Sequence, residues 1–484
     1  MLDAASAPLQ AGLLIGGEWR ASGQTLPVEN PSTGEIVGEI TAGGAAEIDE
    51  AVAAARKALS GEWGGLDATS RGRILTRIGE AVAAETDKLA ELEVMDVGKP
   101  LTQARADAVA LARYLEFYGG AADKFTGETI PFRPGYTVMT LREPHGVTGH
   151  IIPWNYPMQI IGRSVIAALA TGNAAVLKPA EEASLTALAF ARIATAAGLP
   201  AGALNVVPGL GEDAGAALAG HDGVDHVSFT GSSAVGTLIQ TAAAKRAAPV
   251  TLELGGKSAQ LVFDDADIDA ALPFLANAGI QNAGQTCSAA SRILVQRGVY
   301  ERVLAGLAER YRALKVGPAI DDLNVGPLIS AKQHQIVQSY FDLVAQTGAE
   351  VVARGNIIPN APSGGHYFAP ALLAGVKPAD RLAQEEIFGP VQVVIPFDDE
   401  EEAIAIANGT PYGLVAAVWT RDGARQFRVA RRLQAGQVFV NDYGAGGGVE
   451  LPFGGVKMSG HGREKGFEAL YGFTALKTIA VKHG

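Results

Sequence analysis

The chain has 484 residues, of which 48% are hydrophobic and 19% are charged, and its formal net charge is −12. This composition excludes a disordered protein, and the length exceeds what one hydrophobic core usually supports, so we expect at least two domains. Charges of both signs are dispersed along the chain, which argues against a nucleic-acid partner. The single cysteine excludes an internal disulfide framework and fits a reducing compartment.

Neither a secretory signal nor a membrane span is expected. Residues 1–12 lack a basic segment followed by a long apolar one. The most apolar stretch, residues 165–177, is interrupted by Thr171, Gly172 and Asn173 and is too short to cross a bilayer. We therefore expect no membrane partner and a cytoplasmic protein.

The first third of the chain is predicted to be mainly helical. A short strand is expected over residues 13–19, followed by a turn-rich segment at 29–34. Apolar residues three and four apart predict amphipathic helices over residues 45–59, 70–97 and 102–119. Residues 127–144 contain a strand at 137–141 between prolines and glycines, which indicates an excursion away from the first domain.

Strands and helices alternate between residues 145 and 256. Strands are predicted at residues 147–152, 174–178, 203–207 and 226–230, with helices at 184–197 and 213–219. Such alternation is typical of a parallel sheet that binds nucleotides at the carboxyl ends of its strands. The turn at 229–236 follows a strand and begins a helix, so its free N–H groups could face a pyrophosphate, although most such glycine-bounded turns bind nothing.

A second α/β domain is expected from residue 257 onward. Strands are predicted at residues 261–263, 293–296, 391–397 and 438–441. A last strand at 474–482 is too isolated to be stable unless it pairs elsewhere, and we expect it to pair with the sheet of another subunit.

Cys287 is the candidate nucleophile. It lies in Gly284-Gln285-Thr286-Cys287, between a predicted helix at 267–277 and a predicted strand at 293–295. Loops held by rigid elements carry chemistry, and a thiolate is a strong nucleophile. A buried structural cysteine is the alternative. A cysteine hydrolase would need a histidine partner, and the eight histidines are scattered with no comparable motif and no cluster able to hold a metal ion.

Seven further motifs occur in collinear order with this one. They are Pro153-Trp154-Asn155-Tyr156-Pro157, Lys178-Pro179-Ala180-Glu181, the turn from Phe229 to Gly236, Leu252-Glu253-Leu254-Gly255-Gly256-Lys257, Glu385-Glu386-Ile387-Phe388-Gly389-Pro390, Pro452-Phe453-Gly454-Gly455 and Ser459-Gly460-His461-Gly462-Arg463-Glu464. Together they closely resemble the NAD(P)-dependent aldehyde dehydrogenase superfamily over nearly the whole chain. The resemblance implies an α/β fold with a Rossmann-type NAD-binding domain (1–121 and 145–255), an α/β catalytic domain (256–457) and a small β oligomerisation arm (122–144 and 458–484).

The resemblance also implies catalytic roles. Cys287 would attack the aldehyde carbonyl, and the Asn155 side chain with the Cys287 backbone N–H would stabilise the oxyanion. Glu253 would activate the water that hydrolyses the resulting thioester. Its position among apolar residues and glycines predicts burial and a raised pKa, which suits a base. Lys178 is expected to be both a catalytic and a cofactor-binding residue.

NAD is the cofactor that the resemblance implies, with NADP as the alternative. A carboxylate at Glu181 can accept hydrogen bonds from both ribose hydroxyls but would repel a 2′-phosphate, which favours NAD. The predicted cofactor residues are Ile151, Pro153, Trp154, Lys178, Glu181, Gly211, Phe229, Gly231, Ser232, Val235, Leu254, Gly255, Glu386 and Phe388. The predicted arm implies a homodimer or a homotetramer, since exposed strand edges are hazardous in a monomer.

The predicted substrate tunnel contains Tyr156, Ile160, Arg163, Gln281, Thr286, Ser288, Tyr443 and Phe453. An arginine at 163 fits relatives that act on semialdehydes or on aromatic aldehydes, because its planar fork matches a carboxylate. Semialdehyde relatives often have a second arginine where this chain has Gln281, and Arg163 could instead pair with a structural carboxylate.

Two other functions stay open at this stage. A coenzyme-A-acylating semialdehyde dehydrogenase would resolve the thioester with a thiol, but such relatives usually lack the counterpart of Glu253. A non-catalytic structural relative is disfavoured by the joint presence of Cys287, Glu253 and Asn155.

Overall fold

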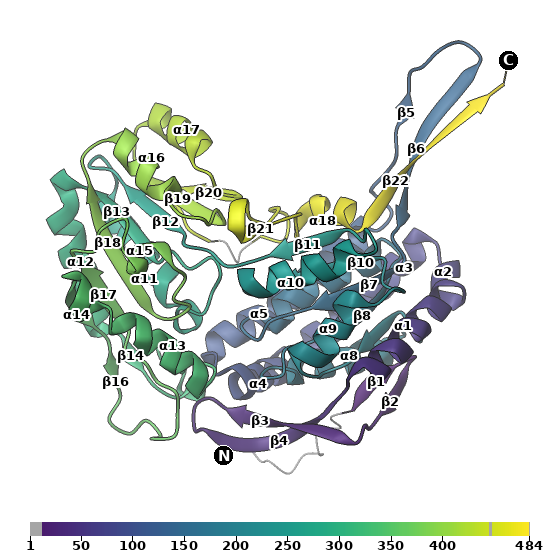
Figure 1. Ribbon diagram of the computed structural model, residues 1–484, viewed down its shortest axis with the longest axis horizontal. Coiled ribbons are helices and arrows are strands. Elements are labelled where there is room, and N and C mark those ends of the chain that lie inside the picture. The colour runs from purple at the N-terminus through teal and green to yellow at the C-terminus, as the bar shows by residue number, and fades with distance from the viewer. Residues whose placement is uncertain (1–11, 445–447, 484) are drawn as a thin grey trace.

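The computed structural model describes residues 12–444 and 448–483, which form two large sheets and three small ones (Figure 1). The first large sheet has eight strands, in the order β2 (Glu18–Arg20), β1 (Leu13–Ile15), β9 (Leu204–Val206), β8 (Ala174–Lys178), β7 (Val147–Ile151), β10 (His226–Thr230), β11 (Val250–Glu253) and β21 (Gly460–His461). The five strands from β9 to β11 are parallel, and their neighbours at both edges are antiparallel.

The second large sheet has seven strands, in the order β15 (Glu350–Arg354), β17 (Ala371–Ala374), β18 (Val391–Phe397), β13 (Arg292–Gln296), β12 (Ala259–Val262), β19 (Val415–Trp419) and β20 (Gln437–Val440). All its neighbours are parallel except β15 and β17. Each sheet has its own large hydrophobic core, as a chain of this length requires.

Helices cover the faces of both sheets (Figure 1). Those before residue 250 are α1 (Ala45–Leu59), α2 (Glu62–Gly65), α3 (Ala68–Ala84), α4 (Thr86–Val97), α5 (Leu101–Ala121), α6 (Pro157–Ile160), α7 (Ile166–Ala170), α8 (Leu185–Ala196), α9 (Ala216–Gly220) and α10 (Ser233–Ala244). Those after it are α11 (Ile268–Ile280), α12 (Tyr300–Ala313), α13 (Ala331–Phe341), α14 (Val344–Thr347), α15 (Arg381–Gln384), α16 (Glu400–Asn408), α17 (Gly423–Arg432) and α18 (Gly466–Gly472).

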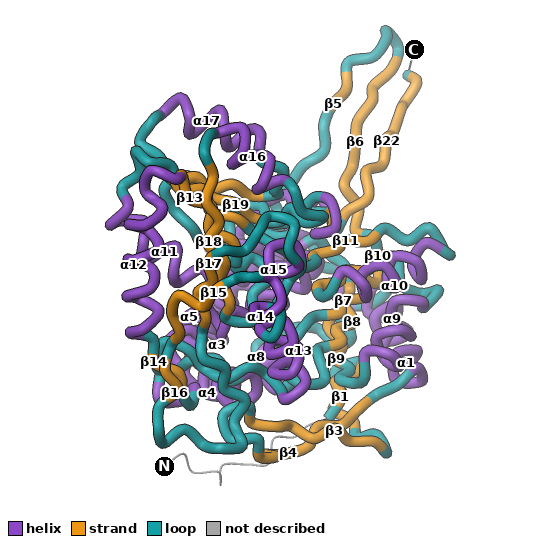
Figure 2. Tube along the Cα trace, turned by 60° about the vertical axis from the view of Figure 1, so that its left-hand side comes forward, coloured by secondary structure: helices purple, strands orange, loops and turns teal. Residues whose placement is uncertain are grey.

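Three small sheets complete the fold. They are β3 (Gln24–Asn30) with β4 (Glu35–Ala42), β14 (Lys315–Val316) with β16 (Asn356–Ile357), and β22 (Thr474–Lys482) with β6 (Tyr136–Pro144) and β5 (Thr129–Ile130). The last of these projects from the body of the molecule in both views and has the C-terminus near its tip (Figures 1 and 2). We call it the arm. Strand β22 pairs antiparallel with β6 of the same chain, from Thr474 with Pro144 to Lys482 with Tyr136. Pairing of β22 with another subunit, as expected from the sequence, stays a prediction.

Residues 458–473, which the sequence assigned to the arm, pack on the first sheet. Strand β21 pairs with the edge strand β11, and α18 contributes Ala469 and Leu470 to the first core. The chain enters the arm only at Thr474, after buried Phe473. This return of the C-terminal segment to the first sheet also brings Glu464 beside the candidate active site.

Several local predictions differ from the structure for identifiable reasons. Residues 13–19 form the hairpin β1–β2 through Gly16 and Gly17, which both have positive φ. The predicted turn at residues 29–34 lies where β3 meets β4, and neither strand was predicted, since β4 exposes the adjacent apolar residues Ile36 and Val37 and shows no regular alternation. The helix predicted over 70–97 breaks at Glu85, which ends α3 and begins α4 although neither Gly nor Pro is near.

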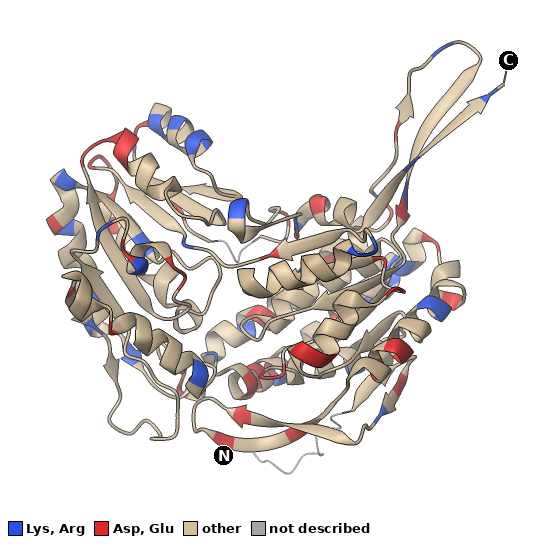
Figure 3. Ribbon diagram, in the orientation of Figure 1, with Lys and Arg blue, Asp and Glu red and all other residues tan. Residues whose placement is uncertain are grey.

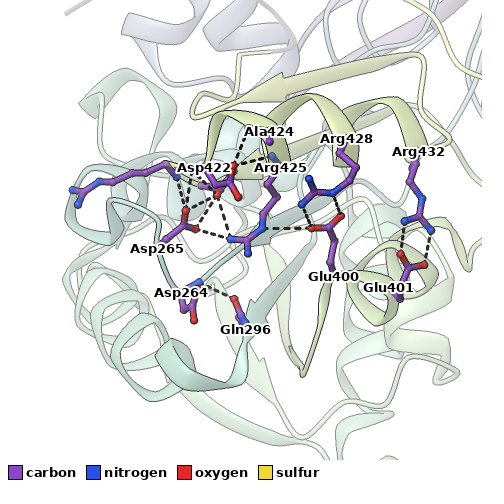
Figure 4. Close-up of polar contacts among 12 residues, drawn as sticks. Asp264, Asp265, Gln296, Glu400, Glu401, Asp422, Ala424, Arg425, Arg428 and Arg432 are labelled. Atoms are coloured by element: carbon purple, nitrogen blue, oxygen red, sulfur yellow. Dashed lines mark hydrogen bonds and ion pairs between the residues drawn. The ribbon is translucent and has the colours of Figure 1, made fainter.

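Charged residues of both signs are interspersed along the ribbon (Figure 3). Next to the second large sheet, Asp422 accepts hydrogen bonds from the N–H groups of Ala424 and Arg425 in the first turn of α17, and Arg428 of that helix donates to Glu400 of α16 (Figure 4). Arg425 links the same helix to Asp265. Exposed ion pairs contribute about 0–1 kcal/mol each, so these contacts orient the helices more than they stabilise them. Among the described residues no helix has the length and apolarity that crossing a bilayer demands.

Candidate active site

The first sheet changes its direction of strand order between β7 and β10. From β7 the chain proceeds outward through β8 and β9, and it then returns to β10 on the opposite side of β7. Ligands in open α/β sheets bind at such a switch point, beyond the carboxyl ends of the strands. The segment with Trp154 and Asn155 follows β7, and Gly231 and Ser232 follow β10, so both lie at this position.

One cavity of about 760 Å³ extends from this switch point into the space between the two large sheets. Its wall includes the predicted catalytic residues Cys287, Glu253 and Asn155, and all eight residues predicted for the substrate tunnel. Seven of the predicted cofactor residues also line it, namely Pro153, Trp154, Gly231, Ser232, Gly255, Glu386 and Phe388. The other seven are not part of the cavity wall; they are Ile151, Lys178, Glu181, Gly211, Phe229, Val235 and Leu254.

Cys287 lies on a loop with an unusual backbone. After α11, Asn282, Ala283 and Gly284 have φ values of +47°, +54° and +73° in succession. A β-carbon on Gly284 would lie 2.3 Å from the Gly389 carbonyl, so only glycine fits there. Non-glycine residues with left-handed backbones cost of order 1–3 kcal/mol each and persist where the surroundings impose them, often at functional sites.

Hydrogen bonds hold this strained loop in place. The Gln285 side chain donates to Asn282 O over 3.0 Å and accepts from Ile329 N over 2.9 Å. The Asn282 amide group donates to Asn155 O over 3.0 Å, and the Asn155 amide group donates to Gln285 O over 2.9 Å. An amide group carries two N–H donors, so Asn155 can hold the loop with one and offer the other to an oxyanion beside Cys287.

Glu253 ends strand β11 and is 1% exposed. Neither of its carboxyl oxygens has a hydrogen-bond partner among the described residues. Burial and then the nearby Glu464 carboxylate raise its pKa well above the ordinary value, against the opposing effect of Arg163. A β-carbon on Gly454 would lie 2.6 Å from Glu253 Oε1, so the glycine leaves the room that the carboxyl group occupies.

Arg163 lies on a π-helical turn, Ile161–Val165, of the kind found at functional sites. Its Nε is 2.5 Å from Glu464 Oε2, and its guanidinium carbon is 4.8 Å from the centroid of the Phe453 ring. Ser228 donates a hydrogen bond of 3.2 Å to the other oxygen of Glu464. The Arg163 side chain therefore lines the cavity and at the same time forms a buried ion pair.

The environment of Cys287 favours the neutral thiol in the absence of ligands. Burial raises its pKa to about 12, and the Arg163 guanidinium acts in the opposite direction. The neighbouring Thr286 hydroxyl is 3.0 Å from the Tyr156 hydroxyl, and the Tyr443 hydroxyl donates to the Ser288 carbonyl. Both aromatic side chains therefore hold the residues on either side of the nucleophile.

A buried ion cluster behind Tyr156 was not predicted from the sequence. Lys99 Nζ lies 3.9 Å from the centroid of the Tyr156 ring and 2.7 Å from Glu93 Oε1, and it also contacts Asp107. The only local feature in the sequence that could have drawn attention to Lys99 is its position between Gly98 and Pro100, directly after a predicted helix. Lys465, which also lines the cavity, was missed although it follows Arg463-Glu464 directly.

The part of the cavity that the predicted cofactor residues line contains a carboxylate and two aromatic rings. Glu386 accepts a hydrogen bond of 2.9 Å from Gly256 N, and a β-carbon on Gly255 would lie 2.2 Å from its Oε2. Trp154 and Phe388 meet edge to face with their centroids 5.3 Å apart. Beyond the wall, Lys178 Nζ pairs with Glu181 Oε2 at 2.8 Å.

The Ser232 hydroxyl accepts from Val235 N as the N-cap of α10. Carboxylates for ribose hydroxyls and a helix N-terminus for phosphate match the needs of a dinucleotide.

Comparison with known proteins identifies the family. The model of the aldehyde dehydrogenase family matches residues 19–479. The chain belongs to the aldehyde dehydrogenase family. A solved family member from Burkholderia cenocepacia is 61% identical, with a TM-score of 0.97 over 98% of this chain and 100% of the other. Cytosolic aldehyde dehydrogenase 1 of the rat is 41% identical over 97% of this chain and 94% of its own length.

The NAD+ complex of an aldehyde dehydrogenase from Bacillus cereus is 38% identical, with a TM-score of 0.95 over 98% of this chain and 97% of the other. The predicted family and the predicted fold are thus confirmed, and the chain is an aldehyde dehydrogenase. Cytosolic and mitochondrial enzymes both occur among the relatives, so the cytoplasmic location stays a prediction.

Proposed function

We propose that this aldehyde dehydrogenase oxidises its aldehyde to the free carboxylic acid with NAD+, through a covalent intermediate on Cys287. The observation that carries the proposal is the shared cavity. A thiol, an amide donor and an unpartnered carboxyl group (Cys287, Asn155 and Glu253) line the same cavity as Glu386 and Phe388, which suit a nicotinamide riboside.

In the first step the Cys287 sulfur attacks the carbonyl carbon, and the thiol proton leaves to solvent. A C–S bond forms while the carbonyl π electrons move to the oxygen. That oxyanion accepts hydrogen bonds from the Asn155 side-chain N–H and from the Cys287 backbone N–H. One donor of this kind contributes roughly 3–4 kcal/mol of transition-state stabilisation. A bound NAD+ would be the oxidant: it would accept the hydrogen of the thiohemiacetal carbon as a hydride, and the carbon that stays bonded to Cys287 would become a thioester.

Glu253 then serves as the general base. Its carboxylate takes a proton from water, the water oxygen attacks the thioester carbon, and the C–S bond breaks to release the acid and the Cys287 thiolate. A buried carboxyl group with no hydrogen-bond partner suits this role, because nothing in the described protein competes for the proton-accepting oxygen. Its raised pKa makes the Glu253 carboxylate a stronger base toward the attacking water than an ordinary glutamate.

The cofactor would be held by its two ends. Glu386, packed on Gly255, would accept from the nicotinamide ribose, and Phe388 would lie against the ring. Glu181, held by Lys178, would accept from the adenosine ribose and would repel a 2′-phosphate, which favours NAD over NADP. Several aldehyde dehydrogenases of this fold, including that of Bacillus cereus, form NAD+ complexes.

A panel of aldehydes with NAD+, with and without coenzyme A, tests this proposal. We expect NADH and the free acid to form in equal amounts without coenzyme A. A coenzyme-A ester as the main product would favour the acylating alternative. If no aldehyde is oxidised by folded enzyme that binds NAD+, the proposal fails. The panel should include semialdehydes and aromatic aldehydes, which Arg163 and the aromatic wall of the cavity favour.

We propose that the arm makes the protein a dimer or a tetramer. It exposes Phe132, Leu476 and Val481, and β22 is an edge strand of nine residues. Long apolar edges invite pairing with another chain. Ending the chain at Thr474 keeps buried Phe473 and removes most of β22, and we expect the mass measured by light scattering to fall. A chain ended at Lys482 is the control. An unchanged mass for the shorter chain would contradict the role of the arm.

A further inference from the structure

Gln103 connects the loop that carries Cys287 to a helix of the other hydrophobic core. It lies in the first turn of α5, whose Leu111 belongs to the core of the first sheet, whereas Ala283 of the loop belongs to the core of the second. Gln103 Oε1 accepts a hydrogen bond of 2.9 Å from Asn282 N, 179 residues away in the sequence. Residues 281–288, which we call the nucleophile loop, are thus fastened across the junction of the two cores.

The bond is made where the loop departs from a helical backbone. Asn282 is the first of the three consecutive residues with positive φ, and it is 1% exposed. Its side chain donates to Asn155 O, and the Asn155 amide group donates to Gln285 O, two residues before Cys287. Loss of the acceptor of Asn282 N would therefore leave a donor unpaired and would remove one of the contacts that hold the strained backbone.

Helix α5 is a rigid support for this contact. It is 21 residues long and packs against α3 and α4. Its N-cap residue, Pro100, provides no side-chain cap, but Asp322 accepts hydrogen bonds from Thr102 N, over 2.7 Å, and from the Thr102 hydroxyl. A carboxylate at a helix N-terminus satisfies a free N–H group and interacts favourably with the helix dipole. Thr102 therefore ties the same end of α5 to a segment other than the nucleophile loop.

We propose that Gln103 is a positioning residue of the reaction: it holds the nucleophile loop where Cys287 and the Asn155 amide group meet the same carbonyl group. The proposal rests on the proposed function, because it concerns the same nucleophile and the same oxyanion. Gln103 lines the cavity, but in this role it acts through Asn282 and not on the substrate. A displacement of reacting groups by about 1 Å can cost on the order of 10²-fold in rate, so one acceptor has a large effect.

The test removes the acceptor and measures the first turnover. Gln103→Met has a side chain of similar length without a carbonyl oxygen, whereas Gln103→Glu keeps an oxygen that accepts the same N–H. At saturating aldehyde and NAD+, the rate of the first NADH formed per active site should fall by about 10- to 100-fold in Gln103→Met. In Gln103→Glu it should stay within about threefold of wild type. The loss should be similar for every aldehyde that the enzyme oxidises, because a displaced nucleophile affects them all.

Amide hydrogen exchange gives a readout that does not require activity. Removal of the acceptor of Asn282 N should speed exchange in the peptide that covers residues 281–288 in Gln103→Met, and exchange in Gln103→Glu should match wild type. Thr102→Val is the matched control, since it removes the hydroxyl hydrogen bond to Asp322 and leaves the acceptor of Asn282 N in place. We expect wild-type first-turnover rates and wild-type exchange of this peptide in Thr102→Val.

Gln103→Leu repeats the loss of the acceptor if the methionine variant folds poorly. A first-turnover rate within about threefold of wild type in a folded variant without the acceptor overturns the proposal. Unchanged exchange of residues 281–288 also overturns it, as does an equal loss in Thr102→Val, which would assign the effect to the seating of α5. A loss that raises KM for some aldehydes only would make Gln103 a substrate contact instead. If wild type oxidises no aldehyde, the proposed function itself has failed, and the exchange measurement still decides whether Gln103 holds the loop.

Discussion

Replacing Cys287 by serine is expected to abolish aldehyde oxidation, with a loss on the order of 10³-fold or more in kcat. A hydroxyl is a far weaker nucleophile than a thiol, and the described residues of the cavity wall include no histidine that could activate it. The variant changes one atom in a loop held by Gln285 and Asn282, so the fold should persist.

The measurement is NADH formation with the best aldehyde of the panel, together with NAD+ binding by calorimetry. We expect binding to survive, because Glu181, Glu386 and Phe388 are untouched. Ser288→Ala is the neighbouring control, since the loop carbonyl of Ser288 still accepts from Tyr443 in that variant. Residual activity of Cys287→Ser within about tenfold of wild type, or roughly 1.4 kcal/mol in barrier, would remove Cys287 from its role.

The thiol itself can be titrated because it is the single cysteine of the chain. Its pKa of about 12 means that alkylation of the free enzyme should be slow at neutral pH and should accelerate as pH rises. One label per chain in wild type and none in Cys287→Ser would confirm the assignment of the reactive group.

Elements with strong local signals could be predicted from the sequence. Helix α1 has the predicted bounds, and strand β18 likewise, because apolar spacing and flanking turn residues agree there with the tertiary structure. The break at Glu85 could not be predicted, since the chain turns there to pack α4 against α5 and carries no Gly or Pro. The hairpin β3–β4 lies at the surface and buries few of its side chains, so its sequence shows no regular apolar alternation from which its strands could be predicted.

The residues of the candidate site likewise fall into those that local motifs indicate and those that only long-range contacts bring together. The motifs that carried the resemblance bring Cys287, Glu253 and Asn155 to the wall of one cavity. Asn155 follows strand β7, which was predicted, whereas Glu253 ends strand β11, which was not. The partner of Arg163 lies 301 residues away at Glu464, and no local pattern indicates such a contact. The same return of the C-terminal segment brings in Lys465, and the ion cluster at Lys99 depends on α4 and α5 meeting behind Tyr156.

Replacing Glu253 by glutamine is expected to separate oxidation from hydrolysis. The amide keeps the shape of the side chain and fits beside Gly454, but it cannot take a proton from water. The thioester on Cys287 should therefore form once and persist. In rapid mixing with excess aldehyde and NAD+ we expect one NADH per active site, followed by a steady rate lower by about 10²- to 10⁴-fold, the usual contribution of general base catalysis.

The pH profile distinguishes this role from a structural one. Hydrolysis needs the ionised carboxylate, and burial holds the Glu253 pKa well above its ordinary value, so the wild-type steady rate should rise with pH as this group ionises. Glutamine has no proton to lose, so the slow steady rate of Glu253→Gln should lack that rise. Glu450→Gln removes an exposed carboxylate that pairs with Arg113 of the cavity wall, and it should show neither a burst nor an altered profile. A steady rate equal to wild type in Glu253→Gln, with no burst, would assign the base to another residue, and Glu464 would then be the carboxylate to replace next.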